Sequence, residues 1–159
     1  MFKHCALTIF LLFPLAVQAQ TNIALGGISA DPTAPVEVTA DSLNVDQDSK
    51  SAVFSGNVVI GQGEMRISAA EVKVIYSEAT GDIAQLLASG GVTFVTATEA
   101  AEAQTADYNL TTGLLTLTGE VLLTQGASAL SADSMIVNLT DGTATMQGRV
   151  RTVFQQGNP

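Results

Sequence analysis

The chain has 159 residues, of which 47% are hydrophobic, and its 15 acidic and six basic side chains give a formal net charge of −9 at pH 7. It contains one cysteine, one histidine and no tryptophan. Such an acidic chain is poorly suited to binding nucleic acid or an anionic bilayer surface, because both would repel it.

Residues 1–19 have the features of a secretory signal peptide. A basic residue, Lys3, precedes an apolar run over residues 6–17, and Val17-Gln18-Ala19 places small residues where a signal peptidase cuts. A membrane anchor is the alternative, but about 20 apolar residues are needed to span a bilayer. This run is shorter and contains Pro14. We therefore predict export, with cleavage after Ala19.

Cleavage at this point narrows the chemistry of the mature chain. Cys5 and His4 are both lost, which excludes a disulfide framework, a cysteine nucleophile, a Ser-His-Asp triad and a histidine-ligated zinc site. Five basic residues then face 15 acidic ones, so the net charge becomes −10. We expect no metal, no cofactor and no nucleic acid partner.

Residues 20–34 lack periodicity and contain two glycines and a proline, which predicts a flexible lead-in. A short pairing segment around Ile23 and Leu25 is the one strand that this stretch allows. The main domain is predicted over residues 35–154 and a C-terminal tail over 155–159. At 140 residues, the mature chain is long enough for one domain with a single core.

From Pro35 onward, apolar residues alternate with a period of two, which is typical of β-strands. A glycine recurs on the core-facing parity, as in Phe54-Ser55-Gly56-Asn57-Val58 and again at Gly90, Gly119 and Gly148. The glycines are 34, 29 and 29 residues apart, which indicates four copies of one supersecondary unit. A glycine within a strand permits a sharp bend, so we interpret these four as bends in a curved sheet.

A second repeating feature is a one-residue slip in the alternation. It occurs where an alanine precedes an acid, at Ala40-Asp41, Ala70-Glu71, Ala106-Asp107 and Ala132-Asp133. A slip would turn all later side chains to the wrong face unless the strand bends or bulges there. These four pairs are therefore predicted to be corners.

These features predict an all-β fold with no significant helix. Hairpin turns are expected at 46–50, 80–82, 111–113 and 140–142. Residues 97–106 are the one helical candidate, and a loop that leads into a strand explains them equally well. We favour a curved antiparallel β-jelly roll, an open sandwich of about four internal repeats. A parallel solenoid is the alternative, but the units are too long and too rich in hairpins for it.

The inward-facing residues are numerous and mostly small. They include few phenylalanines, so two sheets about 10 Å apart would leave an underfilled interior. An open apolar slot of this kind would accept acyl chains. Gln62 and Thr93 are expected to face outward. The candidate lipid-lining residues are Val38, Leu43, Val45, Phe54, Val58, Ile60, Ile67, Val72, Val74, Leu86, Val92, Phe94, Tyr108, Leu110, Leu117, Val121, Leu123, Met135, Val137, Met146 and Val150.

Three stretches carry a resemblance to a known family. They are Ala70-Glu71-Val72-Lys73-Val74-Ile75-Tyr76, Phe54-Ser55-Gly56-Asn57-Val58 and Ala88-Ser89-Gly90-Gly91-Val92. Over about residues 35–154 the chain resembles the OstA-like (LptA) family, the periplasmic bridge proteins of lipopolysaccharide transport. The resemblance implies a β-jelly roll that shields lipid A acyl chains, with no reaction and no cofactor. It also implies LptC-like inner-membrane and LptD-like outer-membrane partners of the same fold.

An open jelly roll has unpaired strand edges, which serve for strand addition unless they are protected. Residues 36–40 and 150–154 are the expected edges. Arg149 and Arg151 give the second edge local positive charge, whereas the first carries Glu37 and Asp41. We expect head-to-tail self-association through these edges, although the same charges also suit solvated edges that discourage aggregation.

Two other classes of function remain open. An enzyme without cysteine or histidine would need paired carboxylates or a Ser-Lys pair. Asp46 and Asp48 are close in sequence but fit a turn, and acids that recur once per repeat indicate a structural role. The stronger alternative is an exported structural or adhesive β-repeat module, which would have a well-filled core and no affinity for lipid.

Overall fold

A computed structural model describes residues 21–24, 28, 31 and 33–154 of the chain. The predicted signal peptide and C-terminal tail lie outside these residues, and so does Leu25. The described residues include no helix that is long and apolar enough to cross a membrane. The helical candidate at 97–106 is two strands instead.

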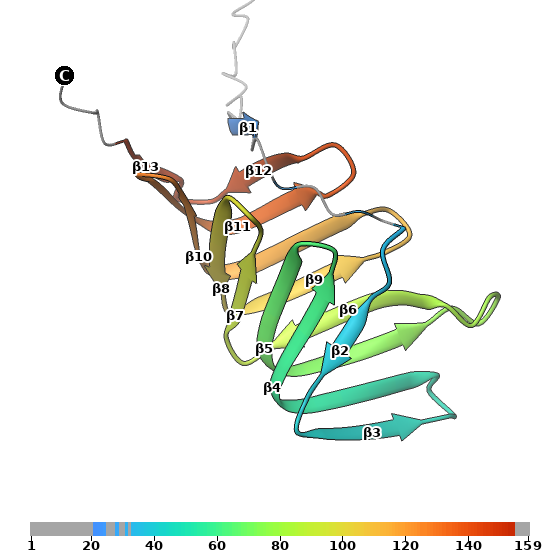
Figure 1. The fold of residues 1–159 in the computed structure, drawn as a ribbon. Coiled ribbons are helices and arrows are strands. Elements are labelled where there is room, and N and C mark those ends of the chain that lie inside the picture. Colours follow the sequence, from blue (N-terminus) through green and yellow to red (C-terminus); the bar gives the residue numbers. More distant parts are fainter. Residues whose placement is uncertain (1–20, 25–27, 29–30, 32, 155–159) are drawn as a thin grey trace, which may run out of the picture.

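Within the described part of the chain, 13 strands form a single sheet in which all pairs are antiparallel (Figure 1). The predicted all-β fold is therefore confirmed. The strands are β1 (Thr21–Ala24), β2 (Glu37–Thr39), β3 (Ser42–Asp46), β4 (Ser51–Gln62), β5 (Met65–Tyr76), β6 (Ile83–Ser89), β7 (Val92–Val95), β8 (Glu99–Ala103), β9 (Thr105–Asn109), β10 (Leu114–Gln125), β11 (Ser128–Asn138), β12 (Thr143–Gln147) and β13 (Arg151–Val153).

The sheet is folded over along one line, which we call the crease. In β4, Gly56 (φ +81°) and Asn57 (φ +46°) together oppose a single residue of β5, so the register shifts there. In β10, Gly119 (φ +88°) and Glu120 (φ +48°) oppose a single residue of β11 in the same way. Such bulges bend a strand sharply. Each of these long strands therefore crosses from one half of the sheet to the other.

The other two glycines lie in the gaps between short strands. Gly90 (φ +80°) and Gly91 (φ +86°) connect β6 to β7, and Gly148 (φ +77°) and Arg149 (φ +45°) connect β12 to β13. Each glycine packs against a residue of the neighbouring strand pair, so closely that an added Cβ would lie within 2.6 Å of it. The facing pairs are Gly56 with Asp41, Gly90 with Ala70, Gly119 with Gln104 and Gly148 with Asp133.

One predicted corner is in the wrong place. The third bend lies at Gln104, between β8 and β9, and not at Ala106-Asp107. The Gln104 amide donates to the carbonyl oxygens of Thr118 (3.1 Å) and Gly119 (3.0 Å), as the Asp41 and Asp133 amides donate to Gly56 and Gly148. Thr105 is exposed, so the inward parity ends at Ala103 and resumes at Ala106.

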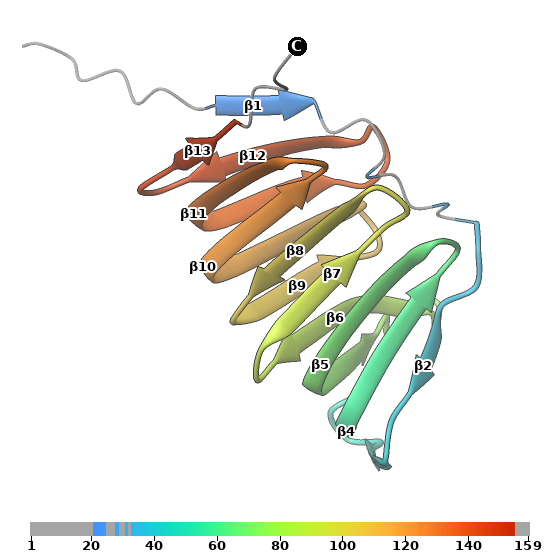
Figure 2. The same cartoon turned by 60° about the vertical axis from the view of Figure 1, so that its left-hand side comes forward.

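Crossing the crease at every bend produces two stacked layers, visible in Figure 2. One half contains β2, the second part of β4, the first part of β5, β7, β8, the second part of β10, the first part of β11, and β13. The other half contains β3, β6, β9, β12, β1 and the remaining parts of the long strands. The molecule is a jelly roll, as predicted, and not a parallel solenoid.

The bends also explain why the first glycine spacing is longer than the others. Gly56 to Gly90 includes the connection from β5 to β6, where six residues, 77–82, separate the strands. The corresponding connection from β9 to β10 has four residues, 110–113. The strands β5 and β6 also continue further beyond the crease than β9 and β10 do. The extra residues therefore lie at a hairpin and leave the crease in line.

Candidate functional site

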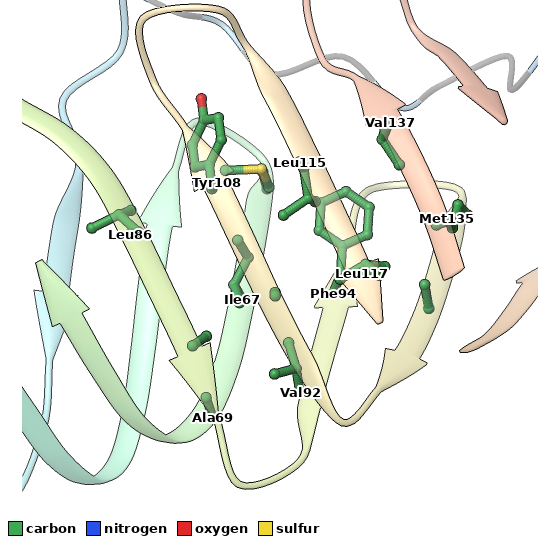
Figure 3. Packing of buried hydrophobic residues seen from close by; sticks show 14 of the residues in the cluster. Ile67, Ala69, Leu86, Val92, Phe94, Tyr108, Leu115, Leu117, Met135 and Val137 are labelled. Atoms are coloured by element: carbon green, nitrogen blue, oxygen red, sulfur yellow. The ribbon is translucent and has the colours of Figure 1, made fainter. Parts of the chain in front are cut away.

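The space between the two halves of the sheet is lined almost entirely by apolar side chains. Figure 3 shows Ile67, Phe94 and Leu117, with seven other labelled residues, projecting into it. Fifteen of the predicted lining residues are buried there. They are Val58, Ile60, Ile67, Val72, Val74, Leu86, Val92, Phe94, Tyr108, Leu117, Val121, Leu123, Met135, Val137 and Met146.

The remaining six predicted lining residues lie toward the margins of this interior. Val38, Phe54 and Leu110 are half-buried and pack against the core. Leu43 (55% exposed) and Val45 (60%) lie on β3, and Val150 (40%) precedes β13. Leu43 is directly opposite Phe54, and Val45 is opposite the buried Ala52, so both face the interior side of the sheet. They are exposed because β3 is the last strand of its half.

The interior is closed in this structure, in contrast to the open slot that the sequence suggests. Val58, Ile60, Phe94, Leu117 and Val121 are each 0% exposed, so side chains fill the space between the two halves. Protein interiors of this kind are close-packed and hold few voids larger than a water molecule. An acyl chain could therefore enter only if the halves moved apart.

Two buried residues of the interior are not among the predicted ones. Met65 (1% exposed) shares the inward parity of Ile67, so the alternation of β5 could have revealed it. Ile28 (0% exposed) comes from the aperiodic stretch before β2, and no pattern in the sequence indicates its burial. It belongs to the same core cluster as the strand residues.

Opposite the crease lies the open side of the folded sheet, where the hairpin turns of both halves end and the side chains become polar. Gln62, the last residue of β4, is 3% exposed, so its predicted outward orientation is wrong. Its Oε1 accepts a hydrogen bond from the Tyr108 hydroxyl (2.9 Å), and its Nε2 donates to the Ala34 carbonyl (3.2 Å). This pair joins β4 in one half to β9 in the other. Burial raises the pKa of the Tyr108 phenol.

A second buried polar group lies on the same side. The Glu99 carboxylate, 3% exposed, accepts hydrogen bonds from Thr96 Oγ1 (2.8 Å), Gln125 Nε2 (3.1 Å) and the Thr98 hydroxyl. Among the described residues, no buried side-chain nitrogen or oxygen lacks a partner. These contacts tie together the hairpins of one half and leave no polar group free to act chemically.

The two ends of the layered sheet are its unprotected parts. β2 and β3 form one end, and β13 and β1 form the other; each of these strands pairs with only one neighbour (Figure 1). Exposed apolar side chains gather at both ends, with Leu43 and Val45 at the first and Val153 (50%) and Phe154 (74%) at the second. Unpaired strand edges with apolar side chains are suited to pairing with another chain.

The two ends also differ in charge. Glu37, Asp41 and Asp46 lie on or beside β2 and β3, whereas Arg149 and Arg151 lie at the other end. Arg149 is bonded to Asp133 (2.6 Å), and this hydrogen bond and charge raise the pKa of the guanidinium. The side chains are 85% and 46% exposed, so the ion pair contributes little to stability.

The described residues contain no group of three or more histidine, cysteine, aspartate or glutamate side chains that could hold a metal ion. The predicted corner acids each lie at the crease or beside it and are structural in their contacts. The feature with functional potential is therefore the apolar interior, together with its two open ends.

Comparisons with known proteins agree on one family. The family model described as the LptA/(LptD N-terminal domain) LPS transport protein matches residues 37–143. A curated protein of Rhizobium meliloti (strain 1021), described as uncharacterised, is 25% identical over 124 residues, which are 73% of this chain and 67% of that protein. The crystal structure of LptH from Pseudomonas aeruginosa, described as the LptA-homologous periplasmic component of the lipopolysaccharide transport device, shares this fold. It has a TM-score of 0.72 and 18% sequence identity, and the match covers 80% of this chain and 99% of LptH.

Proposed function

Because this chain belongs to the LptA/LptD N-terminal domain family of lipopolysaccharide transport proteins, we propose that it carries lipopolysaccharide across the periplasm as a bridge protein. The observation that carries the proposal is the apolar interior, which runs between two open ends. A lipid that enters at one end can keep its acyl chains among apolar side chains while its charged head group stays in water. Each methylene group so buried contributes about 0.8 kcal/mol.

The charge of the protein supports this division of labour. At a net charge of −9 the surface has few cations with which to grip phosphate groups. Binding through the tails therefore suits this chain better than binding through the head group. The function needs no catalytic group and no cofactor.

The ends support a further part of the proposal, which concerns partners. Strand addition at β2 and β3 or at β13 and β1 would extend both halves of the sheet and continue the apolar interior into the next unit. The partners of this kind are a second copy of the chain and proteins of the same fold at the inner and outer membranes, the LptC-like and LptD-like components.

One observation favours a second candidate function. The interior is filled by its own side chains, as expected for an exported structural β-repeat module that binds no lipid. The two candidates make opposite predictions about contact between the interior and lipopolysaccharide, so one experiment separates them.

The experiment is photocrosslinking in intact cells from neighbouring positions on β7. A photoreactive phenylalanine analogue replaces either the buried Phe94 or the exposed Thr93, which differ by one residue and face opposite sides of the sheet. We expect lipopolysaccharide adducts from position 94 and from the half-buried Phe54, and none from position 93. Equal labelling of both faces, or labelling of neither, would contradict lipid carriage and favour the structural module.

A further inference from the structure

The residues that precede β2 lie on the open side of the folded sheet. We use the name strap for Ile28, Asp31 and residues 33–36. The strap follows β1, which pairs with β12 at one end of the molecule, and it leads into β2 at the other end (Figure 2). It therefore passes the side on which the two halves would have to separate.

Ile28 acts as a plug for the interior. It is 0% exposed and is among the largest fully buried side chains of the molecule, although it belongs to no strand. It packs within the same cluster as Phe94, Leu117 and Met65. An apolar side chain that is supplied from outside the sheet, in the place where apolar lipid is proposed to bind, occupies part of that site.

Polar contacts hold the strap at the edge of the interior. The Gln62 side chain bonds both to the Ala34 carbonyl of the strap and to the Tyr108 hydroxyl of the opposite half. One buried amide thus fastens three segments together. Since a buried amide that lost these partners would be left unsatisfied, the strap and the contact between the halves support each other.

A tight turn fixes the shape of the strap where it meets the sheet. Asp31 Oδ1 accepts hydrogen bonds from the Thr33 amide (2.9 Å) and hydroxyl (2.6 Å), and the Ala34 amide donates to the Asp31 carbonyl (3.1 Å). This turn rests on the hairpin between β4 and β5. A Cβ added at Gly63 would lie 3.9 Å from the Cβ of Asp31 and 4.0 Å from that of Ala34.

We propose that the strap is a displaceable closure of the interior, with Ile28 as an internal substitute for an acyl chain that lipopolysaccharide must expel. This inference rests on the proposed function. An acyl chain has several times the apolar area of one isoleucine side chain, so it can outcompete Ile28 for the interior. When the strap leaves, Gln62 loses its Ala34 partner, and the two halves are freer to part. Empty protein is thereby kept closed to water and to other apolar ligands.

A disulfide that locks the strap tests this directly. The Cβ separation of 4.0 Å between positions 34 and 63 lies within the range of natural disulfides. Ala34→Cys and Gly63→Cys are combined in a Cys5→Ser background, which removes the only native thiol. Binding of fluorescently labelled lipopolysaccharide is then measured by anisotropy, for the oxidised and the reduced protein. We expect oxidation to weaken binding at least tenfold and reduction to restore it.

The controls separate the strap from the function on which it rests. Gly63→Cys alone should bind equally well with and without oxidant. If the double variant binds lipopolysaccharide with the same affinity when oxidised and when reduced, the strap is not a closure, although the carrier function stands. If neither the reduced variant nor the wild-type protein binds, the carrier function is wrong and the strap has no role in it.

A second measurement does not depend on the disulfide. Ile28→Cys in the same background places a single thiol within the closed interior. We expect this thiol to react slowly with a maleimide in the empty protein and at least tenfold faster once unlabelled lipopolysaccharide is added. The same rate in both states would mean that Ile28 stays in place when lipid binds, which would overturn the proposal.

Discussion

At the crease, the backbone of Gly90 and Gly91 separates two effects that usually occur together. Both residues have positive φ (+80° and +86°), which is unfavourable for any other residue type by about 1 kcal/mol or more. They differ in their surroundings. A Cβ at Gly90 would lie 2.6 Å from the Cβ of Ala70, whereas a Cβ at Gly91 would have no atom within 4 Å.

This difference predicts the cost of two adjacent substitutions. Gly91→Ala should lower the free energy of unfolding by about 1 kcal/mol, from backbone strain alone. Gly90→Ala should cost a further 1–3 kcal/mol or so, because the Cβ of Ala70 is fixed to the backbone and cannot move aside. Urea denaturation of the two variants measures both values. Equal costs would mean that the close approach across the crease is unimportant, and Ala70→Gly should recover part of the loss in the Gly90→Ala background.

Residues at the crease also show where sequence reasoning succeeds and where it fails. The regular spacing of Gly56, Gly119 and Gly148 points to repeated bends because few other residues tolerate positive φ twice over in a strand. The partner residues are less regular. Asp41 and Asp133 carry an acid, but Gln104 takes the same place in the third bend, and the alanine-acid pair that follows it at Ala106 misled the prediction.

The burial of Gln62 and Ile28 could not be predicted for a different reason. Alternation within β4 does place Gln62 on the same face as Ile60, but a polar side chain at the end of a strand normally faces water. Its partners, Tyr108 and Ala34, are 46 and 28 residues away in the sequence. Ile28 has no periodic neighbours at all. Both depend on tertiary contacts that a one-dimensional pattern does not contain.

Among the elements, β3 and β13 are exposed because each lies at one end of a half-sheet. The exposed apolar residues of these strands have exposed fractions similar to that of Leu122 (40%), which lies on the outer face of β10 in the middle of the sheet. Exposure alone therefore does not distinguish an edge that pairs with another chain from an ordinary surface. The position of the strand does.

Lysine substitutions test this distinction. Val45→Lys on β3 and Val153→Lys on β13 place a charge at a strand edge, which opposes pairing with another chain. We expect each to abolish concentration-dependent oligomers of the protein in light scattering coupled to sizing. Leu122→Lys introduces the same charge away from both ends and should leave the oligomers unchanged. Loss of oligomers in all three variants would show that net charge, and not the strand edge, controls association.

For the molecule as a whole, the two halves of the sheet are held together differently on their two sides. At the crease the chain itself connects them through every bend. On the open side, the hydrogen bond between Tyr108 and Gln62 joins them. Since Tyr108 can ionise, the stability of this connection depends on pH.

Burial raises the pKa of the Tyr108 phenol above its value in the unfolded chain, which is about 10. The unfolded state therefore loses the proton first, and the contribution of Tyr108 to stability is complete below about pH 10 and declines as the pH rises through the folded-state pKa. Urea unfolding between pH 8 and pH 11 should show a decline in the wild-type protein that is shallower in Tyr108→Phe. Identical slopes in the two proteins would mean that Tyr108 stays protonated or that the halves do not depend on it.

The position of the bends has a consequence for how proteins of this kind change in length during evolution. Each strand crosses the crease once, and two successive crossings, Gly90 to Gly119 or Gly119 to Gly148, take 29 residues. An insertion or duplication of such a block returns the chain to the same half with the same side chains facing inward. A block that contains only one crossing would leave the chain in the opposite half and invert the order of every later strand. Viable relatives should therefore grow or shrink by whole pairs of crossings, with smaller insertions confined to hairpins such as residues 77–82.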